Sequence, residues 1–514
     1  MGLMAQMIIS KSEYMMFLKH PAWLWLKKHD KSKLPPPDDN LQAMFDAGNA
    51  FEVYAEQLFS DGVRLGFNDY QEYLSLPART EKALADGAKT IFQGRFEYGQ
   101  ITFICDVLQV VGDKLVDLTE IKSSTKVKPE HELDLAFQAY VLQQCGWQVR
   151  NVSVVHVNTD YVRQGEIDPA KLTATTDVTH DVKMRLVQTE RDIKSALHVV
   201  AQPTMPDPSP ARCRLGCLPE WMDIYRGLRT VEKGSIYELT RIDPSLIGVL
   251  EEEGITELKN IPPDIIQNDK QKIQLEVVRS GKPIIHKDKI RNFLDSLTYP
   301  LYFFDYETLS SVVPYFDGMR PYAQYPFQYS LHVIDQPGGE LRHSGYLHSD
   351  NSNPAEALSR TLTSQISTTG SVLTWYMPFE KSCNTTLGEL VPEYAEFYQE
   401  LNSRIMDLMT PFSKGWYVDA AFGGSASIKK VMPALIPSLS YKELDIQEGG
   451  AAQRLWMESV LDGKHQEQKQ DILANLNKYC ELDTLAMVEI YDFLQKLVAE
   501  DSIVGKPVQL DLDW

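Results

Sequence analysis

Cysteine is scarce in this sequence, and long apolar runs are missing. Six cysteines in 514 residues cannot form a disulfide framework, so we expect a reducing compartment. No apolar stretch reaches the roughly 18 residues that a membrane-spanning helix needs. The first ten residues also lack the basic start of a signal peptide. These absences predict a cytoplasmic protein with no membrane partner.

Positive charge is also in deficit, since 51 Lys and Arg face 71 Asp and Glu, a formal net charge of −20. This balance argues against a protein that coats nucleic acid through bulk charge, but it leaves room for a local basic groove. A hydrophobic fraction of 43% and a charged fraction of 24% are typical of a globular protein. The length predicts two to four domains.

The order of predicted elements indicates an α/β protein with two αβ domains joined by a small helical module. Two β-rich runs, 101–111 and 115–121, are joined by Gly112-Asp113, which is typical of a hairpin. A helix at 133–145 and a strand at 149–157 follow, and a second αβ alternation starts at Leu301. We therefore predict domains at 1–225 and 296–514, with the helical module at 226–295.

The predicted hairpin carries the first set of candidate site residues. Glu120 and Lys122 point to one face because side chains in a strand repeat every two residues, and the hairpin would bring Asp106 beside them. Two carboxylates beside an ammonium suit a Mg²⁺ site that activates water. The alternative is a surface strand with one ion pair. Lys126 and Lys128 follow as candidate phosphate contacts.

This region resembles the PD-(D/E)XK nuclease superfamily, in particular RecB-like and CRISPR-associated nucleases. The resemblance is carried by the Asp…Glu-x-Lys pattern and by three further segments: Ser12-Glu13-Tyr14, His20 to Lys28, and Gly48-Asn49-Ala50-Phe51-Glu52. It implies a restriction-endonuclease-like αβ domain. It further implies that Asp106 and Glu120 hold metal, that Lys122 is catalytic and that Gln138 belongs to the family's glutamine motif.

Two positions depart from that family pattern. Glu52 stands where a metal-binding His is frequent in the family. Relatives often hold an iron–sulfur cluster with four cysteines, whereas this chain offers His20, Cys213 and Cys217. Three ligands fall short of the four that a cluster or a structural zinc ion needs. We therefore expect packing around tryptophans here, with a bound metal as the alternative.

A second set of acids follows a strand that is otherwise apolar. Asp305 and Glu307 end the run that starts at Leu301, Glu380 begins a helix after the next apolar strand, and Tyr479 lies four residues before Asp483 on one helical face. Acids at the end of a buried strand are costly unless they meet a cation. Read singly, Glu380 could be a helix-dipole acid and Asp483 an ion-pair partner.

Taken together, D-x-E, then Glu380, then Y-x-x-x-D resembles the DEDD 3′–5′ exonucleases of the RNase H-like fold. The resemblance implies that Asp305, Glu307, Glu380 and Asp483 hold two divalent ions and that Tyr479 positions the attacking water. The chain resembles still more closely a bacterial family of uncharacterised function, which joins a RecB-like nuclease to such a domain. Tyr302 to Thr308 and Tyr479 to Thr484 carry that likeness.

Three further features accompany these acids in the sequence. Asp407 either joins the metal set or caps a helix. Lys429 and Lys430 follow a Gly/Ser loop that either binds phosphate or is a plain turn. Trp375-Tyr376 stands where many such exonucleases carry Asn, which predicts an altered substrate contact.

The sequence thus predicts a nuclease that uses Mg²⁺ or Mn²⁺, with DNA or RNA as its partner and DNA favoured. An iron–sulfur cluster is not expected. One alternative is a nucleic-acid-binding or partner-binding protein whose N-terminal nuclease is degenerate and whose C-terminal site alone is active. Another is a hydrolase of small nucleotides.

Overall fold

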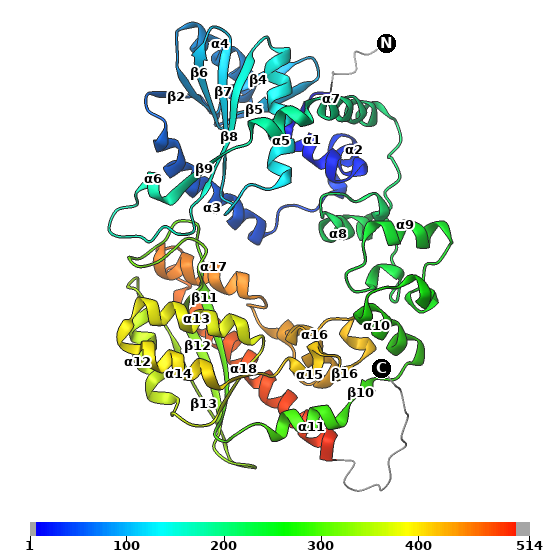
Figure 1. Cartoon of the computed structure of the whole chain (residues 1–514), viewed down its shortest axis with the longest axis vertical. Coiled ribbons are helices and arrows are strands. Elements are labelled where there is room, and N and C mark those ends of the chain that lie inside the picture. Colours follow the sequence, from blue (N-terminus) through cyan, green and yellow to red (C-terminus); the bar gives the residue numbers. More distant parts are fainter. Residues whose placement is uncertain (1–6, 500–514) are drawn as a thin grey trace. The chain divides into compact units, whose positions relative to one another are not determined.

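The computed structural model describes residues 7–499, and contacts within the chain divide it into two compact units (Figure 1). Unit 1 comprises the chain up to Lys233 together with 243–254 and 311–322, and unit 2 comprises the rest. Both units are α/β. The predicted helical module, 226–295, is therefore shared between the two units. Across residues 7–499, no helix combines the length and the hydrophobicity that a membrane crossing requires.

Unit 1 is built on a six-stranded mixed sheet and a smaller three-stranded one. The order in the larger sheet is β2 (Gly62–Arg64), β3 (Thr90–Phe92), β6 (Val107–Gly112), β7 (Leu115–Lys122), β8 (Gln148–Val157) and β9 (Thr173–Asp177). The smaller sheet has the order β1 (Ile9–Ser10), β5 (Ile101–Ile104) and β4 (Arg95–Tyr98). β7 and β8 are parallel, and α5 (Pro129–Gln144) connects them.

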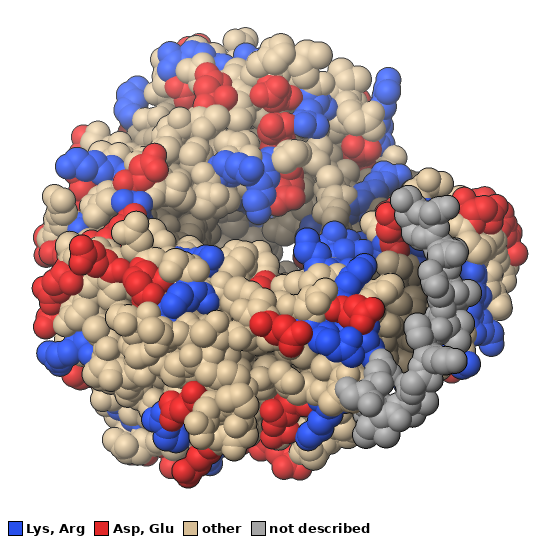
Figure 2. All heavy atoms as spheres, turned by 60° about the horizontal axis from the view of Figure 1, so that its bottom comes forward, with Lys and Arg blue, Asp and Glu red and all other residues tan. Residues whose placement is uncertain are grey.

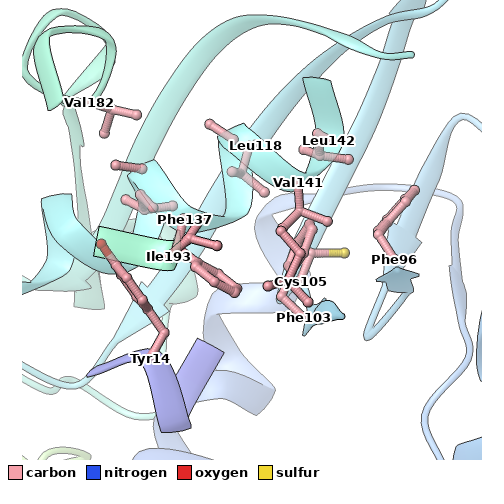
Figure 3. Packing of buried hydrophobic residues seen from close by; sticks show 14 of the residues in the cluster. Tyr14, Phe96, Phe103, Cys105, Leu118, Phe137, Val141, Leu142, Val182 and Ile193 are labelled. Carbon is pink, nitrogen blue, oxygen red and sulfur yellow. The ribbon is translucent and has the colours of Figure 1, made fainter. Parts of the chain in front are cut away.

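Helices cover both faces of the larger sheet. On one face, α1 (Lys11–Lys19), α5 and α7 (Thr179–Ala201) enclose a core in which Tyr14 and Phe137 stack with ring centroids 4.7 Å apart (Figure 3). On the other face, Phe51 and Ala55 of α3 (Asp39–Ala55) pack with Ile121 and Val155. The other helices of unit 1 are α2 (Pro21–His29), α4 (Tyr70–Ala85), α6 (Pro169–Leu172), α8 (Leu218–Leu228) and α9 (Pro244–Glu252).

The predicted hairpin is present as β6 and β7, but the predicted strand over 101–111 is wrong. The chain breaks at Cys105-Asp106, where β5 ends and β6 begins. β5 pairs with β4 and β1 in the smaller sheet, whereas β6 pairs with β3 and β7 in the larger one. Because the apolar run continues through the break, periodicity alone could not reveal that Asp106 lies between two sheets.

Unit 2 is built on a five-stranded sheet. Its order is β13 (Leu341–Leu347), β12 (Tyr325–Ile334), β11 (Leu301–Leu309), β14 (Ser371–Thr374) and β15 (Ile405–Asp407). The first three strands are antiparallel neighbours, and β14 and β15 run parallel to β11. The central strand β11 therefore has neighbours of both directions, and it carries the first acids of the second site.

Alternation along β11 sends its side chains to opposite faces. Tyr302, Phe304 and Tyr306 belong to the core with α12 (Ala355–Gln365), α13 (Met377–Leu390) and α14 (Ala395–Arg404). Phe303 instead packs edge-on against Tyr491 of α18 (Lys469–Ala499). α18 thus covers the face to which Asp305 and Glu307 also point.

The remaining elements of unit 2 are short. They are α10 (Asp269–Ser280), β10 (Ile284–Ile285), α11 (Lys287–Asp295), α15 (Thr410–Ser413), β16 (Tyr417–Val418), α16 (Ile428–Leu435) and α17 (Gly449–Trp456). Pro392 separates α13 from α14, because proline interrupts a helical pattern.

Charged side chains of both signs lie interspersed on the face of the molecule drawn in Figure 2. This mixture of charges agrees with the expectation that the protein would not attract a polyanion through its bulk charge. The two units differ instead in how their buried charged side chains are paired.

Candidate active sites

The hairpin of unit 1 brings Asp106 and Glu120 together. Asp106 directly precedes β6, and its Oδ2 accepts a hydrogen bond of 2.8 Å from the backbone N–H of Ile121 in β7. This bond ties the start of one strand to the end of the other. Burial and the neighbouring Glu120 raise the pKa of Asp106 to about 7. The two carboxylates are therefore close enough to repel each other.

Glu120 is 1% exposed, and donors occupy both of its oxygens. The ammonium groups of Lys122 and Lys11 lie 2.6 and 2.8 Å from its Oε1. Gln138 of α5 donates to its Oε2 at 2.7 Å. Although burial alone would raise the pKa of Glu120, Lys11 and Lys122 hold it well below the usual value. This carboxylate is therefore ionised and fully paired.

A third acid, from α5, completes the cluster. Asp134 lies four residues before Gln138, so both face the strand. Asp134 Oδ2 is 3.2 Å from Lys122 Nζ, and its Oδ1 accepts from Gln138 Nε2 at 3.1 Å. Burial lowers the pKa of Lys122, but Glu120 and Asp134 outweigh this and raise it. In this arrangement Lys122 is protonated.

The donor set of unit 1 fits a hard divalent ion only after rearrangement. Glu120 would have to exchange an ammonium for the ion, whereas Asp106 has no Lys or Arg within 4 Å among residues 7–499. Gln138 Oε1 is buried and lacks a hydrogen-bond partner there, so it is a further free acceptor. Lys126 and Lys128, the predicted phosphate contacts, are exposed.

Glu52 does not join these acids. Its Oε1 accepts a 2.6 Å hydrogen bond from Gln93 Nε2, and Gln93 in turn donates its backbone N–H to the carbonyl of Asp106. Glu52 therefore lies one residue removed from the cluster.

His20, Cys213 and Cys217 lie near one another in a tryptophan-rich core. His20 stacks on Trp221 with centroids 3.8 Å apart. Its Nδ1 accepts from the N–H of Ala22 at 3.1 Å, as the cap of α2, and its Nε2 lies 3.1 Å from the carbonyl of Ser209. Both ring nitrogens thus have backbone partners in a packed, capped arrangement.

In unit 2 the four predicted acids converge from three elements. Asp305 and Glu307 come from β11, Glu380 from the first turn of α13, and Asp483 from the middle of α18. Glu307, Glu380 and Asp483 are 7%, 1% and 8% exposed. Asp305 interacts electrostatically with each of the other three. The sheet and two helices therefore bring four acids into one cluster, and three of them, Glu307, Glu380 and Asp483, are buried.

Crowding and burial both act on these groups. Burial is the main reason why the pKa values of Asp305, Glu307 and Glu380 lie well above their usual range. The negative charge of Asp305 or Asp483 raises them further. Burial raises the pKa of Asp483 to about 6, with hydrogen bonds and Lys429 opposing it. Within residues 7–499, none of the four forms an ion pair within 4 Å.

Two tyrosines hold Asp483. Tyr441 donates to its Oδ1 at 2.5 Å. Tyr479, one helical turn earlier on α18, also helps to lower the pKa of Asp483. The rings of Tyr441 and Tyr479 lie 6.1 Å apart, and Lys429 Nζ lies within 5.7 Å of both. Lys429 also donates to the carbonyl of Gln447. Lys430 is exposed.

Asp407 lies at the edge of the cluster and raises the pKa of Glu380. Its Oδ1 accepts from the N–H groups of Tyr376 and Met409, at 3.2 and 3.0 Å. It therefore shapes the turn before α13. Tyr376 has a φ of +82°, a strained conformation for a non-glycine residue, and its side chain is 54% exposed.

The donor set of unit 2 offers a divalent cation carboxylate oxygens that no lysine or arginine of residues 7–499 pairs with. Asp305 and Glu307 each offer an oxygen within 4.8 Å of the other and of Cys480 Sγ. Glu380 Oε2 is buried and, among the described residues, has no hydrogen-bond partner. Hard oxygen ligands of this kind are those that Mg²⁺ and Mn²⁺ prefer.

Comparisons with known proteins give a family model and two uncharacterised relatives. Residues 302–427 match the model of a domain of unknown function (DUF2779). An uncharacterised protein of Mycoplasma genitalium, MG366, is 25% identical over 249 residues, which are 45% of this chain and 37% of that protein. Its homolog in Mycoplasma pneumoniae is 24% identical over 46% of this chain and 38% of its own length. The chain thus matches well under half of these relatives.

Among solved structures, a phage-related exonuclease from Haemophilus somnus matches 38% of this chain and 92% of its own chain. The identity is 13% and the TM-score is 0.18. The stretch that matches the family model includes Asp305, Glu307, Glu380 and Asp407, but it ends before Tyr479 and Asp483.

Sequence reasoning missed three residues of the two clusters. Asp134 could have been found, because it lies four residues before Gln138 on the same helical face. Lys11 and Tyr441 reach their clusters from segments distant in sequence, 109 and 42 residues from their partners. No local spacing rule links such pairs.

Proposed function

We propose that unit 2 is a metal-dependent nuclease of the DEDD type, which removes nucleotides from the 3′ end of nucleic acid, with DNA favoured. The observation that carries the proposal is the clustering of Asp305, Glu307, Glu380 and Asp483, to which the described part of the chain supplies no ion-pair partner. The mixed sheet with helices on both faces is compatible with an RNase H-like domain.

Each residue of the cluster has a role in this proposal. Two divalent ions held by the four carboxylates would stabilise the attacking and leaving oxygens of an in-line displacement. Tyr479 orients the attacking water through its hydroxyl, while Tyr441 fixes the rotamer of Asp483. Lys429 provides a positive charge for a phosphate oxygen, and the exposed ring of Tyr376 offers a stacking surface to a base.

For unit 1 we propose a PD-(D/E)XK-type centre at Asp106, Glu120, Lys122 and Gln138. A second candidate for this unit is a domain that binds nucleic acid or a partner without cleaving it. The observation that favours the second candidate is that Lys11, Lys122 and Gln138 occupy both oxygens of Glu120.

The test is cleavage of 5′-labelled single-stranded DNA and RNA by the whole chain, with Mg²⁺ and with excess chelator. In Mg²⁺ we expect nucleotides to be removed stepwise from the 3′ end, and in chelator we expect none. Asp305→Asn should reduce the rate about 10³-fold, since charge stabilisation by a metal is worth several kcal/mol. Glu356→Gln, an exposed acid on α12, is the matched control.

Lys122→Ala separates the two candidates for unit 1. Cleavage that survives Lys122→Ala but not Asp305→Asn leaves unit 2 as the catalyst and unit 1 as a binding domain. Cleavage that falls with Lys122→Ala alone would assign catalysis to unit 1. Activity unchanged by Asp305→Asn refutes the proposal for unit 2.

A further inference from the structure

A second group of metal-ligating side chains lies in unit 2, apart from the four carboxylates. His332 of β12 and His343 of β13 are direct cross-strand partners, with ring centroids 4.5 Å apart. Glu481 of α18 lies over them, and its Oε1 is 3.7 Å from His343 Nδ1. One ligand atom from each of the three lies within 4.8 Å of the others.

Hydroxyl groups fix one nitrogen of each imidazole. His332 Nδ1 lies 2.8 Å from Thr484 Oγ1, and His343 Nε2 lies 2.9 Å from Ser330 Oγ. The two hydroxyls are 2.7 Å apart, and Thr484 also donates to the carbonyl of Glu481 at 3.1 Å. All four bonds are satisfied if both imidazoles donate, Ser330 donates to Thr484, and Thr484 donates to the carbonyl.

This proton assignment leaves unprotonated lone pairs on His332 Nε2 and His343 Nδ1. The lone pair of His343 then faces a carboxylate oxygen with no proton between them, which is unfavourable unless a cation or a second ring proton lies there. Metal-binding histidines characteristically donate their other ring N–H to an acceptor, as both do here.

An adjacent cavity provides a separate observation. It has a volume of about 260 Å³, and its lining includes Gln328, Ser330, His343 and Asn477. Gln328 is 1% exposed, and its Oε1 has no hydrogen-bond partner among the described residues. The cavity therefore has room for water beside His343, and it is lined by a buried acceptor that has no donor within residues 7–499.

We propose that His332, His343 and Glu481 form a binding site for Zn²⁺ or a similar late first-row divalent cation. Two imidazoles and one carboxylate are a known zinc ligand set, with the fourth position left to water. Tetrahedral ligands about 2.0–2.1 Å from zinc are roughly 3.4 Å apart, close to the 3.7 Å between His343 and Glu481. Imidazole ligands favour Zn²⁺ over Mg²⁺.

The site would link β12 and β13 to α18 close to the cluster of four carboxylates. Glu481 is two residues before Asp483 on the same helix. Zinc bound between the histidines and Glu481 would thus restrain the helix that supplies the fourth carboxylate. The proposal does not depend on the catalytic activity of that centre.

The test is the amount of Zn²⁺ retained per chain after equilibrium dialysis in excess Mg²⁺, which fills the carboxylate centre. We expect one Zn²⁺ per chain, with His343→Ala weakening zinc affinity about 100-fold and Glu481→Gln about 10-fold or more. Co²⁺ in place of Zn²⁺ should give visible absorption bands of a tetrahedral site, and His343→Ala should remove them. Circular dichroism verifies that each variant is folded.

Two controls separate this site from others. His465→Ala, which changes an exposed histidine elsewhere in unit 2, should leave zinc binding unchanged. Asp305→Asn should also leave it unchanged, even if it abolishes nuclease activity. Zinc retention that is absent in the wild type, that survives His343→Ala, or that depends on Asp305 would overturn the proposal.

Discussion

The two candidate sites place buried carboxylates in opposite electrostatic surroundings. In unit 1, two lysines and a glutamine surround Glu120, and its pKa is held below the usual value. In unit 2, the four acids mainly meet one another, and the pKa values of Asp305, Glu307 and Glu380 are raised. In unit 1 the protein itself neutralises Glu120, whereas Asp106 beside it has a raised pKa like the acids of unit 2.

This difference concerns stability as well as chemistry. Removing a buried carboxylate that is paired with lysines destabilises the fold, because the ammonium groups lose an ion-pair partner. A buried carboxylate among like charges destabilises the metal-free fold, and a bound cation reverses this. The comparison therefore predicts that replacing a carboxylate by its amide lowers the free energy of unfolding of unit 1 but raises that of metal-free unit 2.

The largest expected effect is that of Glu120→Gln in unit 1. This change removes the carboxylate that pairs with Lys11 and one of the two that pair with Lys122. We expect the free energy of unfolding of unit 1 to fall by about 3 kcal/mol. Hydrogen–deuterium exchange with mass spectrometry reports each unit separately, so β7 and α5 should exchange faster while β11 and α18 are unchanged.

The matched change in unit 2 is Asp305→Asn in the metal-free protein. It relieves repulsion with Asp483, so β11 and α18 should exchange more slowly than in the wild type. If both variants destabilise their units alike, the electrostatic contrast between the two sites is wrong.

A somewhat smaller effect is expected from Mg²⁺ itself. At 100 times its dissociation constant, a ligand that binds only the folded state stabilises by about 2.7 kcal/mol. We expect Mg²⁺ to slow exchange in β11, α13 and α18, and a chelator to reverse the effect. Slower exchange confined to β7 and α5 would instead locate the metal in unit 1.

The smallest effect concerns the two tyrosines on Asp483. Tyr479→Phe removes the hydroxyl proposed to orient water, and we expect the cleavage rate to fall about 10- to 100-fold, in the range of general acid–base contributions. Tyr441→Phe, which removes a hydrogen bond to the same carboxylate, should cost less. Initial rates at saturating Mg²⁺ measure both. Equal losses would contradict a special role for Tyr479.

Local spacing explains which features the sequence could predict. The D-x-E of β11 and the Y-x-x-x-D of α18 fix their own faces through periods of two and of about four residues, so these acids were placed correctly on their elements. The hairpin turn at Gly112-Asp113 was recognisable for the same local reason.

Features that depend on distant segments could not be predicted. Lys11 reaches Glu120 across 109 residues, and the break at Asp106 results from pairing with two different sheets. Asp407 follows an ordinary apolar run. Only its hydrogen bonds from backbone N–H groups distinguish a residue that shapes a turn from a metal ligand. Tertiary context decides each of these cases.

The most direct test of the central claim is a crystal structure of the protein grown with saturating Mn²⁺, with anomalous scattering used to locate the ions. We predict two Mn²⁺ ions about 3.5–4 Å apart among Asp305, Glu307, Glu380 and Asp483. Density for Mn²⁺ at Asp106 and Glu120, with none among these four carboxylates, would contradict the account.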